Sequence, residues 1–594
     1  RDGTEGSRMI IEQVVPEGGV PKPSSAVSRW QMGVIGAVAL LAVGIGLVLG
    51  LTVLPSRGSS PLGTSASYVP AGAVVYMEAR LDLPAGQRDS LRTILERFPG
   101  INADDLLTDA VADTLDETLA GSGLPVDYST DIAPWFDGRV AVALLDYPIS
   151  LDVVAPVDLP STAAMIGVRD VEAAQQLTDT LRQEISATGA TFSPSDHAGV
   201  TIWSLGEVLP AGQDFAYALT DDQLLLANGQ ATIETMLDVR AGADSLAQRD
   251  ELRDLSAQLP PEWVGVATID VAAMLDQMLG GLEAADPALA EAMGVYMDMV
   301  PSFVVSTMGF EDDAIRMDSI TPLPGGGVTP TNARRDLAAS VPADAIFFAD
   351  GTNVGPGLTQ MVTGVRAALA AGAGGAEALT QLDQVEAALG GDVGDFVSWI
   401  GSGAMAIGWD GEQPYGGLLL EASDPDAARQ RLGQLRALAE LASLDPSVQV
   451  AVSTAQLDGV EVTTFTVVSP QTDAGMWPTG DIVLQYALDG DTALIGFGDE
   501  FVARALAVGP GASLADQDRF SGAIDRFGGD DNSGAFFLDL VALRAAIETV
   551  TTDTIGPEYE RTVKPNLEPL DYLAGVTRVE GDAIISSFGL VLRP

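Results

Sequence analysis

Carboxylates are the only catalytic side chains that this sequence supplies in number. The chain contains 83 Asp and Glu residues against 30 Lys and Arg, with one histidine and no cysteine. A zinc site with the usual nitrogen and sulfur ligands cannot be assembled from a single histidine. A Ser-His-Asp triad would have to use His197, in the turn-like segment SPSDHAG, and a Ser-Lys dyad would need Lys564. We interpret both residues as solvent-exposed, assign no catalytic residue, and expect no metal and no cofactor.

Paired carboxylates could act as a general acid and a general base, as they do in glycoside hydrolases. Aspartic proteases take one Asp from an Asp-Thr/Ser-Gly turn in each of two lobes, but Asp491-Thr492-Ala493 and the matching Asp222-Gln223-Leu224 both depart from that pattern. The segment GGDDNSG at 528–534 has acidic and amide oxygens at the wrong spacing for a calcium loop, so we interpret it as a turn first and a weak cation site second. A carboxylate-dependent hydrolase acting on envelope glycans remains an alternative to a protein without enzyme activity.

Long stretches of the chain match each other at a constant spacing. YALTDDQLLLANG at 217–229 returns as YALDGDTALIGFG at 486–498, an offset of 269 residues that also relates GVATIDVAAM at 265–274 to GAFFLDLVAL at 534–543. Further matches join 68–79 to 340–351, 131–146 to 395–410, and 169–182 to 423–436. A period this long indicates paired domains, because solenoid repeats are about 20–50 residues long. The sequence predicts a tandem duplication, with copies at 68–323 and 340–594 and a linker at 324–339.

Each copy has the pattern of an α+β domain. Short apolar runs such as AVVYMEA and QLLLA are typical of strands, and the apolar spacing within 91–98 is typical of an amphipathic helix. Asp489-Gly490 favours the positive φ of a hairpin turn, with a helix beginning after Gly498, and Asp222 and Asp491 fall in the matching turns. We predict a mainly antiparallel sheet with helices covering one face of it.

Several duplicated residues have structural explanations. Asp270 and Asp539 each follow a strand and precede a helix, which predicts that they are N-caps, and the same reasoning applies to Asp170 and Asp424. Trp135 and Trp399 lie in apolar surroundings, and we interpret them as core anchors rather than sugar-stacking platforms. They belong to a set that aligns without gaps: Asp131, Trp135 and Asp146 on Asp395, Trp399 and Asp410.

Residues 32–54, MGVIGAVALLAVGIGLVLGLTVL, contain no charge. At about 1.5 Å per residue, this segment is long enough to cross a lipid bilayer as a transmembrane helix. Lys22 and Arg29 precede it, so the positive-inside rule predicts a cytoplasmic, disordered tail at 1–31 and an extracytoplasmic bulk. A cleaved signal peptide is the alternative, but its apolar region is normally only about 7–15 residues long. We therefore favour a retained single-pass signal anchor, followed by a flexible tether at 55–67.

Small residues recur every four positions within this segment, at Ala42, Gly46 and Gly50. That spacing lets two membrane helices approach closely, and it suggests weak dimerisation. The alternative interpretation is that glycine is simply common in membrane helices.

The net charge of −53 restricts the partners of this protein. Binding to nucleic acid or to anionic lipid needs Lys and Arg side chains that neutralise phosphates, and these are scarce here. We therefore exclude nucleic acid as a partner. The charge itself fits adaptation to high salt or a coding bias.

One membrane segment, a short tether, VPAGAVVYMEARLD at 69–82 and RTILERFPG at 92–100 follow one another in this chain. This arrangement resembles an uncharacterised bacterial family, domain of unknown function thirty-three fifty-two. The resemblance implies a membrane-anchored, exported protein with no assigned activity. The leading hypothesis is a non-enzymatic protein of the cytoplasmic membrane whose paired extracytoplasmic domains bind an envelope protein or polymer. A helper for export or folding is a further alternative, which an apolar rather than an acidic lining of the cleft would favour.

Overall fold

The computed structural model describes residues 62–594 except 106, 108–111, 113–114, 118, 120–125, 147–159, 188, 207–213, 286, 288–289, 291–293, 295–298, 335, 372–374, 445–449, 468–480 and 551–555. The predicted tail at 1–31 and the predicted membrane segment at 32–54 therefore lie outside the described residues. Within the described part, no helix combines the length and the apolar character needed to cross a membrane.

The predicted tether is wrong at its end. Ser65–Tyr68 forms the 3₁₀ helix η1, and Leu62, Ala66 and Tyr68 are buried in the hydrophobic core. Turn-rich composition suggested a loop here, but three apolar side chains in seven residues are enough to fix the segment against the sheet, because each gains burial. The folded body begins at or before Leu62.

Helices and strands follow a similar order in the two halves of the chain. The first half contains η1 (Ser65–Tyr68), β1 (Val75–Arg80), α2 (Ala85–Leu95), α3 (Ala103–Asp105), η3 (Tyr128–Ile132), β2 (Phe136–Leu144), β3 (Thr162–Val168), α5 (Val171–Ala187), β4 (Thr191–His197), β5 (Val200–Gly206), β6 (Phe215–Leu219), β7 (Gln223–Ala227), α6 (Gln230–Ala241), η4 (Leu246–Gln248), α7 (Asp250–Ser256), β8 (Gly265–Asp270), α8 (Val271–Ala285), β9 (Phe303–Glu311) and β10 (Ala314–Pro322). The second half contains β11 (Ala333–Arg334), η6 (Leu337–Ser340), β12 (Ala345–Gly351), α10 (Val354–Ala371), α11 (Gly375–Leu389), α12 (Val393–Val397), β13 (Ile400–Trp409), β14 (Pro414–Ala422), α13 (Pro425–Ala442), β15 (Val450–Leu457), β16 (Val460–Val467), β17 (Ile482–Asp489), β18 (Thr492–Phe497), α14 (Phe501–Leu506), η7 (Leu514–Asp516), α15 (Asp518–Phe527), β19 (Asp531–Asn532), β20 (Gly534–Asp539), α16 (Leu540–Val550), η8 (Tyr559–Val563), α17 (Lys564–Leu567), β21 (Leu570–Glu580) and β22 (Ala583–Leu592). Of these, β11, β19, η8 and α17 have no described counterpart in the first half.

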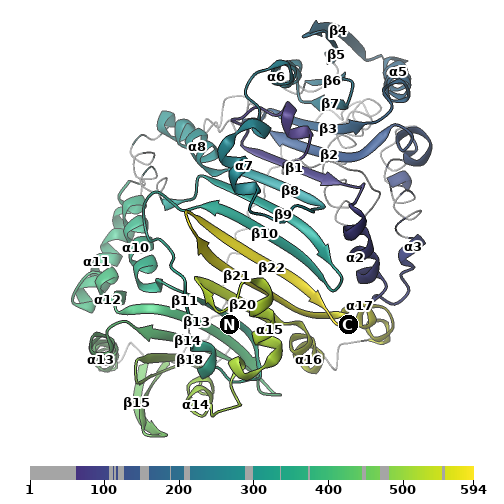
Figure 1. Ribbon diagram of the computed structural model, residues 1–594. Helices are drawn as coiled ribbons and strands as arrows, with labels where there is room; N and C mark the ends of the chain where they lie inside the picture. Colours follow the sequence, from purple (N-terminus) through teal and green to yellow (C-terminus); the bar gives the residue numbers. More distant parts are fainter. Residues whose placement is uncertain are drawn as a thin grey trace, which may run out of the picture.

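One antiparallel sheet of 20 strands runs through the molecule (Figure 1). Pairwise registers place its strands in the order β4-β5-β6-β7-β3-β2-β1-β8-β9-β10-β22-β21-β20-β12-β13-β14-β18-β17-β16-β15. Hairpins make most of the connections, as expected for antiparallel strands. The protein is therefore a mixed helix and strand fold built on a large antiparallel sheet, as the sequence pattern predicts.

The two halves meet edge to edge where β10 pairs with β22. Asp318 lies opposite Ser587, the residue 269 positions later, and the Ser587 hydroxyl donates to Asp318 Oδ1 at 2.6 Å. Ala314 pairs with Val591, and Pro322 pairs with Ala583. The paired segments 314–322 and 583–591 are separated by the same 269-residue offset as the sequence matches, and their register has the symmetry of a contact between two subunits related by a two-fold axis.

Helices pack on both faces of the sheet, so the prediction of a single covered face is wrong. On β14, Leu419 belongs to the core that contains α14 and α15, whereas its neighbour Leu420 belongs to the core under α13. Successive strand residues point to opposite faces. Near-continuous apolar runs such as LLL at 418–420 are the pattern of a strand that is buried on both sides.

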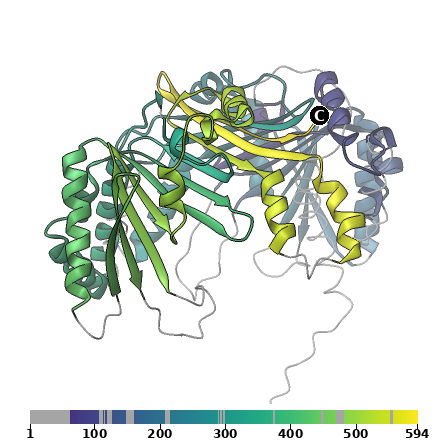
Figure 2. The ribbon, with the colours of Figure 1, turned by 90° about the horizontal axis from the view of Figure 1, so that it is seen from below.

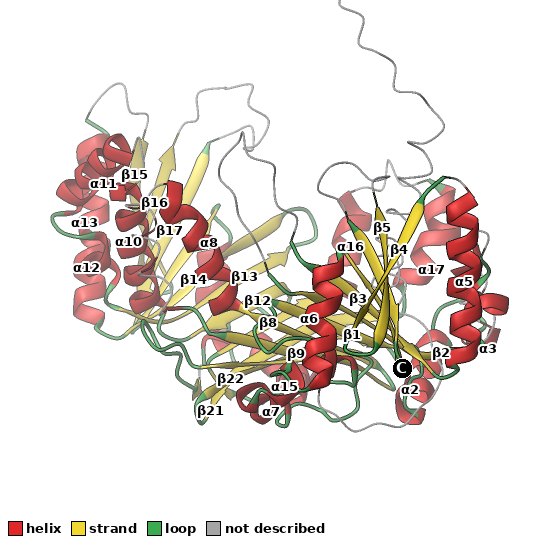
Figure 3. Ribbon diagram, turned by 90° about the horizontal axis from the view of Figure 1, so that it is seen from above, coloured by secondary structure: helices red, strands yellow, loops and turns green. Residues whose placement is uncertain are grey.

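The sheet is bent into an arch (Figures 2 and 3). We call the face that carries α15 the outer face and the opposite one the inner face. Helices α10, α11, α16 and α17 project from the inner side, where they stand on either side of the arch. Helix α16 packs against β20 and β21 and also contacts β12.

Local signals in the sequence are confirmed at several points. Gly490 has φ +62° in the turn between β17 and β18, and α14 begins at Phe501, after Gly498. Asp424 Oδ1 accepts from the N–H groups of Asp426 and Ala427 at the start of α13.

The sequence match aligns 131–146 with 395–410 without gaps. After Trp135 and Trp399 the strand registers differ by one residue, so the gapless alignment is wrong there. Strand β2 contains a bulge: from Phe136 to Val140 it advances four residues, while its partner β3 advances only two, from Val168 to Ile166. The corresponding bulge in β13, between Ile400 and Gly403, is one residue shorter. Because a bulge shifts every later side chain to the other face, Leu144 rather than Ala143 corresponds to Ile407.

Candidate functional site

Three large apolar side chains are exposed together on the inner face of the second half. Met405 and Ile407 on β13 are 39% and 42% exposed, and Phe497 on β18 is 57% exposed. Their neighbours Ala404 and Ala406 are buried in the outer core, as strand alternation requires. We call Met405, Ile407 and Phe497 the inner-face apolar patch.

Glycine makes this patch shallow and open. Gly416 on β14 pairs with Ile407 on one side and with Phe497 on the other. Gly416 adds no side chain between Ile407 and Phe497, whose strands are about two strand spacings, or roughly 10 Å, apart; Ile407 Cγ1 lies 3.3 Å from the position that a Cβ at Gly416 would occupy, so Ile407 leans over the glycine. An exposed apolar sheet surface of this kind is suited to contact an apolar side chain of a partner.

Further apolar side chains continue the patch along the same row of the sheet. Phe347 on β12 pairs with Ile407, and Leu484 on β17 pairs with Phe497. Both are partly exposed. On the helices of the inner side, Met361 and Val365 of α10 and Val550 of α16 are also exposed. The row on the sheet, from Phe347 through Ile407 and Phe497 to Leu484, is larger than the scattered single residues found on most surfaces.

Carboxylates stand at the end of the strands that carry the patch. Glu412 lies in the tight turn between β13 and β14, Asp499 follows Phe497 by two residues, and Asp481 immediately precedes β17. All three are exposed. Asp410 accepts from the N–H groups of Gln413 and Glu412, both at 2.7 Å, and these bonds hold its pKa below the usual range. The patch is therefore bordered on this side by negative charge.

A second polar feature is enclosed beneath η1. Glu78 is only 2% exposed; its Oε2 accepts from the Ser65 N–H at 3.3 Å and from the Tyr76 hydroxyl, while its Oε1 is buried without a hydrogen-bond partner. Burial raises the pKa of Glu78. Gln223 is also fully buried, with both amide atoms unpartnered. These groups are closed off by the chain, so they form no open site.

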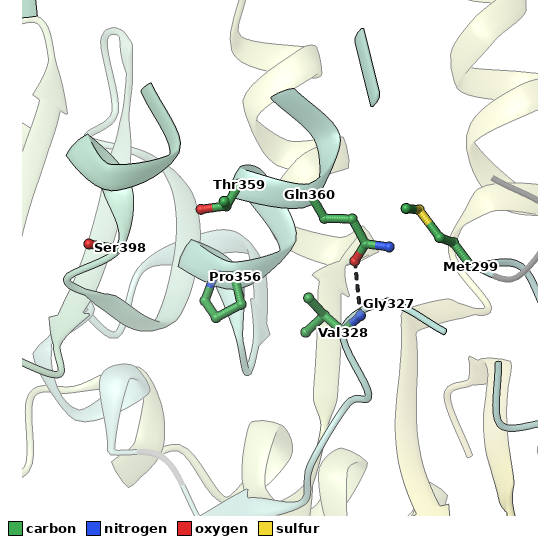
Figure 4. Close-up of a pocket in the computed structure, with 7 residues that line it drawn as sticks. All are labelled: Met299, Gly327, Val328, Pro356, Thr359, Gln360 and Ser398. Atoms are coloured by element: carbon green, nitrogen blue, oxygen red, sulfur yellow. Dashed lines mark hydrogen bonds between the residues drawn. The ribbon is translucent and has the colours of Figure 1, made fainter. Parts of the chain in front are cut away.

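A cavity of about 350 Å³ lies where the linker meets α10. Figure 4 shows the Gln360 side chain directed at the linker, where its Oε1 accepts from the Val328 N–H at 2.9 Å. The lining contains no charged side chain and consists of Met299, Gly327, Val328, Pro356, Thr359, Gln360 and Ser398. This hydrogen bond holds the linker against α10 and accounts for the orientation of the Gln360 side chain.

The duplicated carboxylates take structural roles. Asp270 Oδ1 accepts from the Ala273 N–H at 2.7 Å at the start of α8, and Asp539 Oδ1 accepts from the Ala542 N–H at 2.8 Å at the start of α16. Each also pairs with an arginine, Asp270 with Arg249 and Asp539 with Arg519. Asp170 Oδ1 accepts from Ala173 N at 3.1 Å. The predicted N-caps are confirmed.

The remaining matched residues lie apart from the patch or support the backbone. Asp222 accepts from the Tyr68 hydroxyl beside the turn between β6 and β7, and Asp491 lies in the turn between β17 and β18. Trp135 and Trp399 are buried, which confirms their interpretation as core anchors. Asp131 Oδ2 accepts from the Asp127 N–H, Asp146 binds Ser161, and Asp395 lies in the first turn of α12.

Two single residues differ from their predictions. His197 ends strand β4 rather than lying in a loop, and its Nε2 is 2.6 Å from Asp238 Oδ1 of α6. Polar and turn-forming residues in SPSDH obscured this edge strand, which pairs with β5. Lys564 is not solvated alone, because its Nζ lies 3.4 Å from Glu548 and 3.3 Å from Glu560.

The segment GGDDNSG is partly a strand. Asp531–Asn532 forms β19 and pairs with β11 of the linker. No group of three or more His, Cys, Asp or Glu able to hold a metal is found among the described residues.

Sequence reasoning missed the inner-face apolar patch. The run AMAIGW at 404–409 alternates small and large apolar residues. The alternation predicts that Met405 and Ile407 share one face and that Ala404 and Ala406 share the other. Because both pairs are apolar, the sequence does not indicate which face is exposed.

The chain belongs to the family described as "Protein of unknown function (DUF3352)", whose model matches residues 33–591. This confirms the resemblance inferred from the sequence. No curated protein matches the chain.

Among solved structures, crystal forms I, III and IV of TP0453 are similar at 9%, 10% and 11% identity. The matches cover 45%, 46% and 45% of this chain and 81%, 82% and 81% of TP0453, each with a TM-score of 0.22. At that TM-score the likeness carries no argument about fold or function.

Proposed function

We propose that this protein is a non-enzymatic binding module of the bacterial cell envelope, and that its inner-face apolar patch receives an apolar segment of a partner. The observation that carries the proposal is the joint exposure of Met405, Ile407 and Phe497 on one rigid sheet face. Burying the exposed half of each side chain would contribute about 1 kcal/mol per residue. Three such contacts supply about 3 kcal/mol, a useful part of a moderate affinity.

The apolar character of the patch favours one form of binding module. A helper for export or folding of other envelope proteins needs an apolar surface that accepts unfolded segments. A hydrolase would instead need two free carboxyl groups facing each other across about 5–10 Å. The duplicated aspartates are engaged as caps, in turns or with serine hydroxyls, so the hydrolase alternative gains no support from them.

The wider architecture of the proposal rests on the sequence and on the strand order. We infer that one ancestral segment doubled to give copies at 68–323 and 340–594; the similar element order and the β10–β22 register support this. Residues 32–54 would anchor both copies in the cytoplasmic membrane, with 1–31 inside. Ala42, Gly46 and Gly50 would allow weak pairing of two anchors.

Binding of a neutral, environment-sensitive dye tests the proposal. The full chain is reconstituted in phosphatidylcholine nanodiscs, and the signal of protein-free nanodiscs is subtracted. Replacing Ile407 with threonine and Phe497 with serine should remove at least half of the bound dye. Val171→Thr is the matched control, because Val171 is an exposed apolar residue of α5 in the other half, and it should leave binding unchanged. Equal binding by all three proteins would refute the proposal.

A further inference from the structure

Among the residues that the structure describes, the carboxylates beside the inner-face apolar patch have no cationic partner within ion-pair distance. Glu412, Asp481 and Asp499 form no ion pair within the described part of the chain. The adjoining segment 468–480 contributes no Lys or Arg to its sequence. The nearby Arg504 is already engaged, with Asp344 at 3.2 Å and Glu500 at 3.1 Å, and it lies over the Tyr415 ring. The border of the patch therefore offers uncompensated negative charge.

Charge and apolar surface together select the chemistry of the partner. We infer, on the basis of the proposed function, that the patch binds a cationic amphipathic polypeptide segment, whose apolar face covers Met405, Ile407 and Phe497 and whose Lys or Arg residues face Glu412, Asp481 and Asp499. The net charge of −53 strengthens attraction of cations at long range and disfavours anionic lipids. Complementary charge at the edge of an interface raises the association rate and specificity more than it raises affinity.

The spacing of the patch suits such a segment. Ile407 and Phe497 are separated by β14, so they lie about 10 Å apart. Apolar residues seven positions apart on a helix are also about 10 Å apart along its axis. A helix that places two apolar residues on this row can therefore extend cationic residues past the strand ends toward the carboxylates.

The fold itself does not require the patch. The position of Phe497 in the first half is taken by Asn228, 269 residues earlier, whose side chain accepts from the Thr162 N–H at 2.7 Å and donates to the Pro160 carbonyl. The first half thus folds with a polar residue at this position, directly after β7, that serves the backbone. A phenylalanine left exposed at this position in the second half points to a use other than stability.

A fluorophore at the patch tests this inference directly. The chain has no cysteine, so Gln413→Cys, in the exposed turn between β13 and β14, gives a single site for bimane. The probe is a synthetic peptide of about 14 residues, roughly four helical turns, made of Leu, Lys and one Trp. Tryptophan quenches bimane only on contact, so peptide that merely binds the nanodisc is silent. Bimane at Val171→Cys is the control site.

The expected result separates charge from apolar contact. The cationic peptide should quench bimane at position 413 and not at position 171. Replacing Glu412 with glutamine and Asp481 and Asp499 with asparagine should weaken binding about tenfold, as should raising the salt from 0.15 to 0.5 M, since three exposed charge pairs are lost or screened. Phe497→Ser should weaken binding by a similar factor. Unchanged thermal unfolding shows that each variant is folded.

Each other outcome overturns one of the two proposals. If the triple carboxamide variant binds as tightly as the wild type while Phe497→Ser binds weakly, the cationic partner is refuted and the apolar binding function stands. If Phe497→Ser has no effect, binding is by charge alone and the proposed function fails. If phosphatidylcholine vesicles with spin-labelled acyl chains quench position 413 and the peptide does not, the occupant is a lipid and this inference is wrong.

Discussion

Buried Glu78 should make the folded protein less stable as the pH rises. Replacing Glu78 with glutamine should remove this pH-dependent loss of stability. Glu78 is buried beneath η1, accepts from Ser65 and Tyr76 through Oε2, and leaves Oε1 without a partner. Burial raises its pKa above the ordinary 4.5, although the Tyr76 hydrogen bond and the charge of Arg139 oppose the change. The folded state therefore holds the proton more tightly than the unfolded state does.

The sign of the effect follows from proton linkage. Between the unfolded pKa near 4.5 and the higher folded pKa, the unfolded chain has released its proton while the folded chain keeps it. The free energy of unfolding then falls as the pH rises, by at most about 1.4 kcal/mol per pH unit. Below the unfolded pKa both states are protonated, and the effect is absent. Glutamine cannot ionise, so the variant lacks this slope.

Urea unfolding of the full chain and of Glu78→Gln, at a series of pH values from about 4 to 8, measures the slope. The difference in unfolding free energy between the two proteins should shift steadily in favour of the variant as the pH rises above about 4.5, because every other carboxylate is common to both. Tyr76→Phe is the matched control. The Tyr76→Phe variant keeps the Glu78 carboxyl group but lacks the hydroxyl that lowers the pKa of Glu78. It should therefore retain the loss of stability with rising pH and extend that loss to higher pH. A difference that does not change with pH would refute the reasoning.

Three other substitutions test the fold, each by urea unfolding. Asp539→Ala removes the N-cap of α16 and should cost about 1–2 kcal/mol, whereas Asp539→Asn should cost less because asparagine also caps. Gly575→Ala should cost about 1–3 kcal/mol, because the added methyl group would lie 2.5 Å from the Phe536 ring and 2.6 Å from Phe588 Cβ; no loss would show that both neighbours can shift without cost. Arg526→Met breaks the link from α15 to Asp313, whose pKa that arginine lowers, and should cost about 0.5–1 kcal/mol at neutral pH. Arg526 also pairs with Glu311. The part of the cost that comes from Asp313 should be lost as the pH falls through the folded pKa of Asp313, and a cost independent of pH would contradict the role of this ion pair.

Caps and turns could be predicted because they depend on neighbours in the chain. Asp270 caps α8 through the N–H three residues later, and Gly490 takes positive φ because a tight turn joins adjacent strands. The alternating apolar runs predicted an antiparallel sheet for the same reason, since hairpins join strands that are close in sequence. The bulge in β2, one residue longer than the bulge in β13, escaped prediction because the residues that follow it are apolar in either register.

The candidate site could not be predicted, because exposure depends on what covers a residue from elsewhere in the chain. Leu418 and Ile407 are both apolar strand residues on the inner face, but Leu418 packs in the core under α13 while Ile407 is exposed. Nothing within a few positions of either residue distinguishes the two. The burial of Glu78 is equally non-local, since η1 supplies the groups that cover it.

By itself, the sequence determined the shortage of catalytic side chains, the strongly negative charge, the repeated pattern and the hairpins and caps within it. These properties are composition or interactions over a few residues, so they need no knowledge of the whole fold. Only the tertiary structure decided that β10 and β22 join the halves into one sheet, that helices cover both faces, and that Met405, Ile407 and Phe497 stay exposed. Those outcomes depend on contacts between residues hundreds of positions apart, such as Asp318 and Ser587, and a local pattern carries no information about which distant surface will cover it.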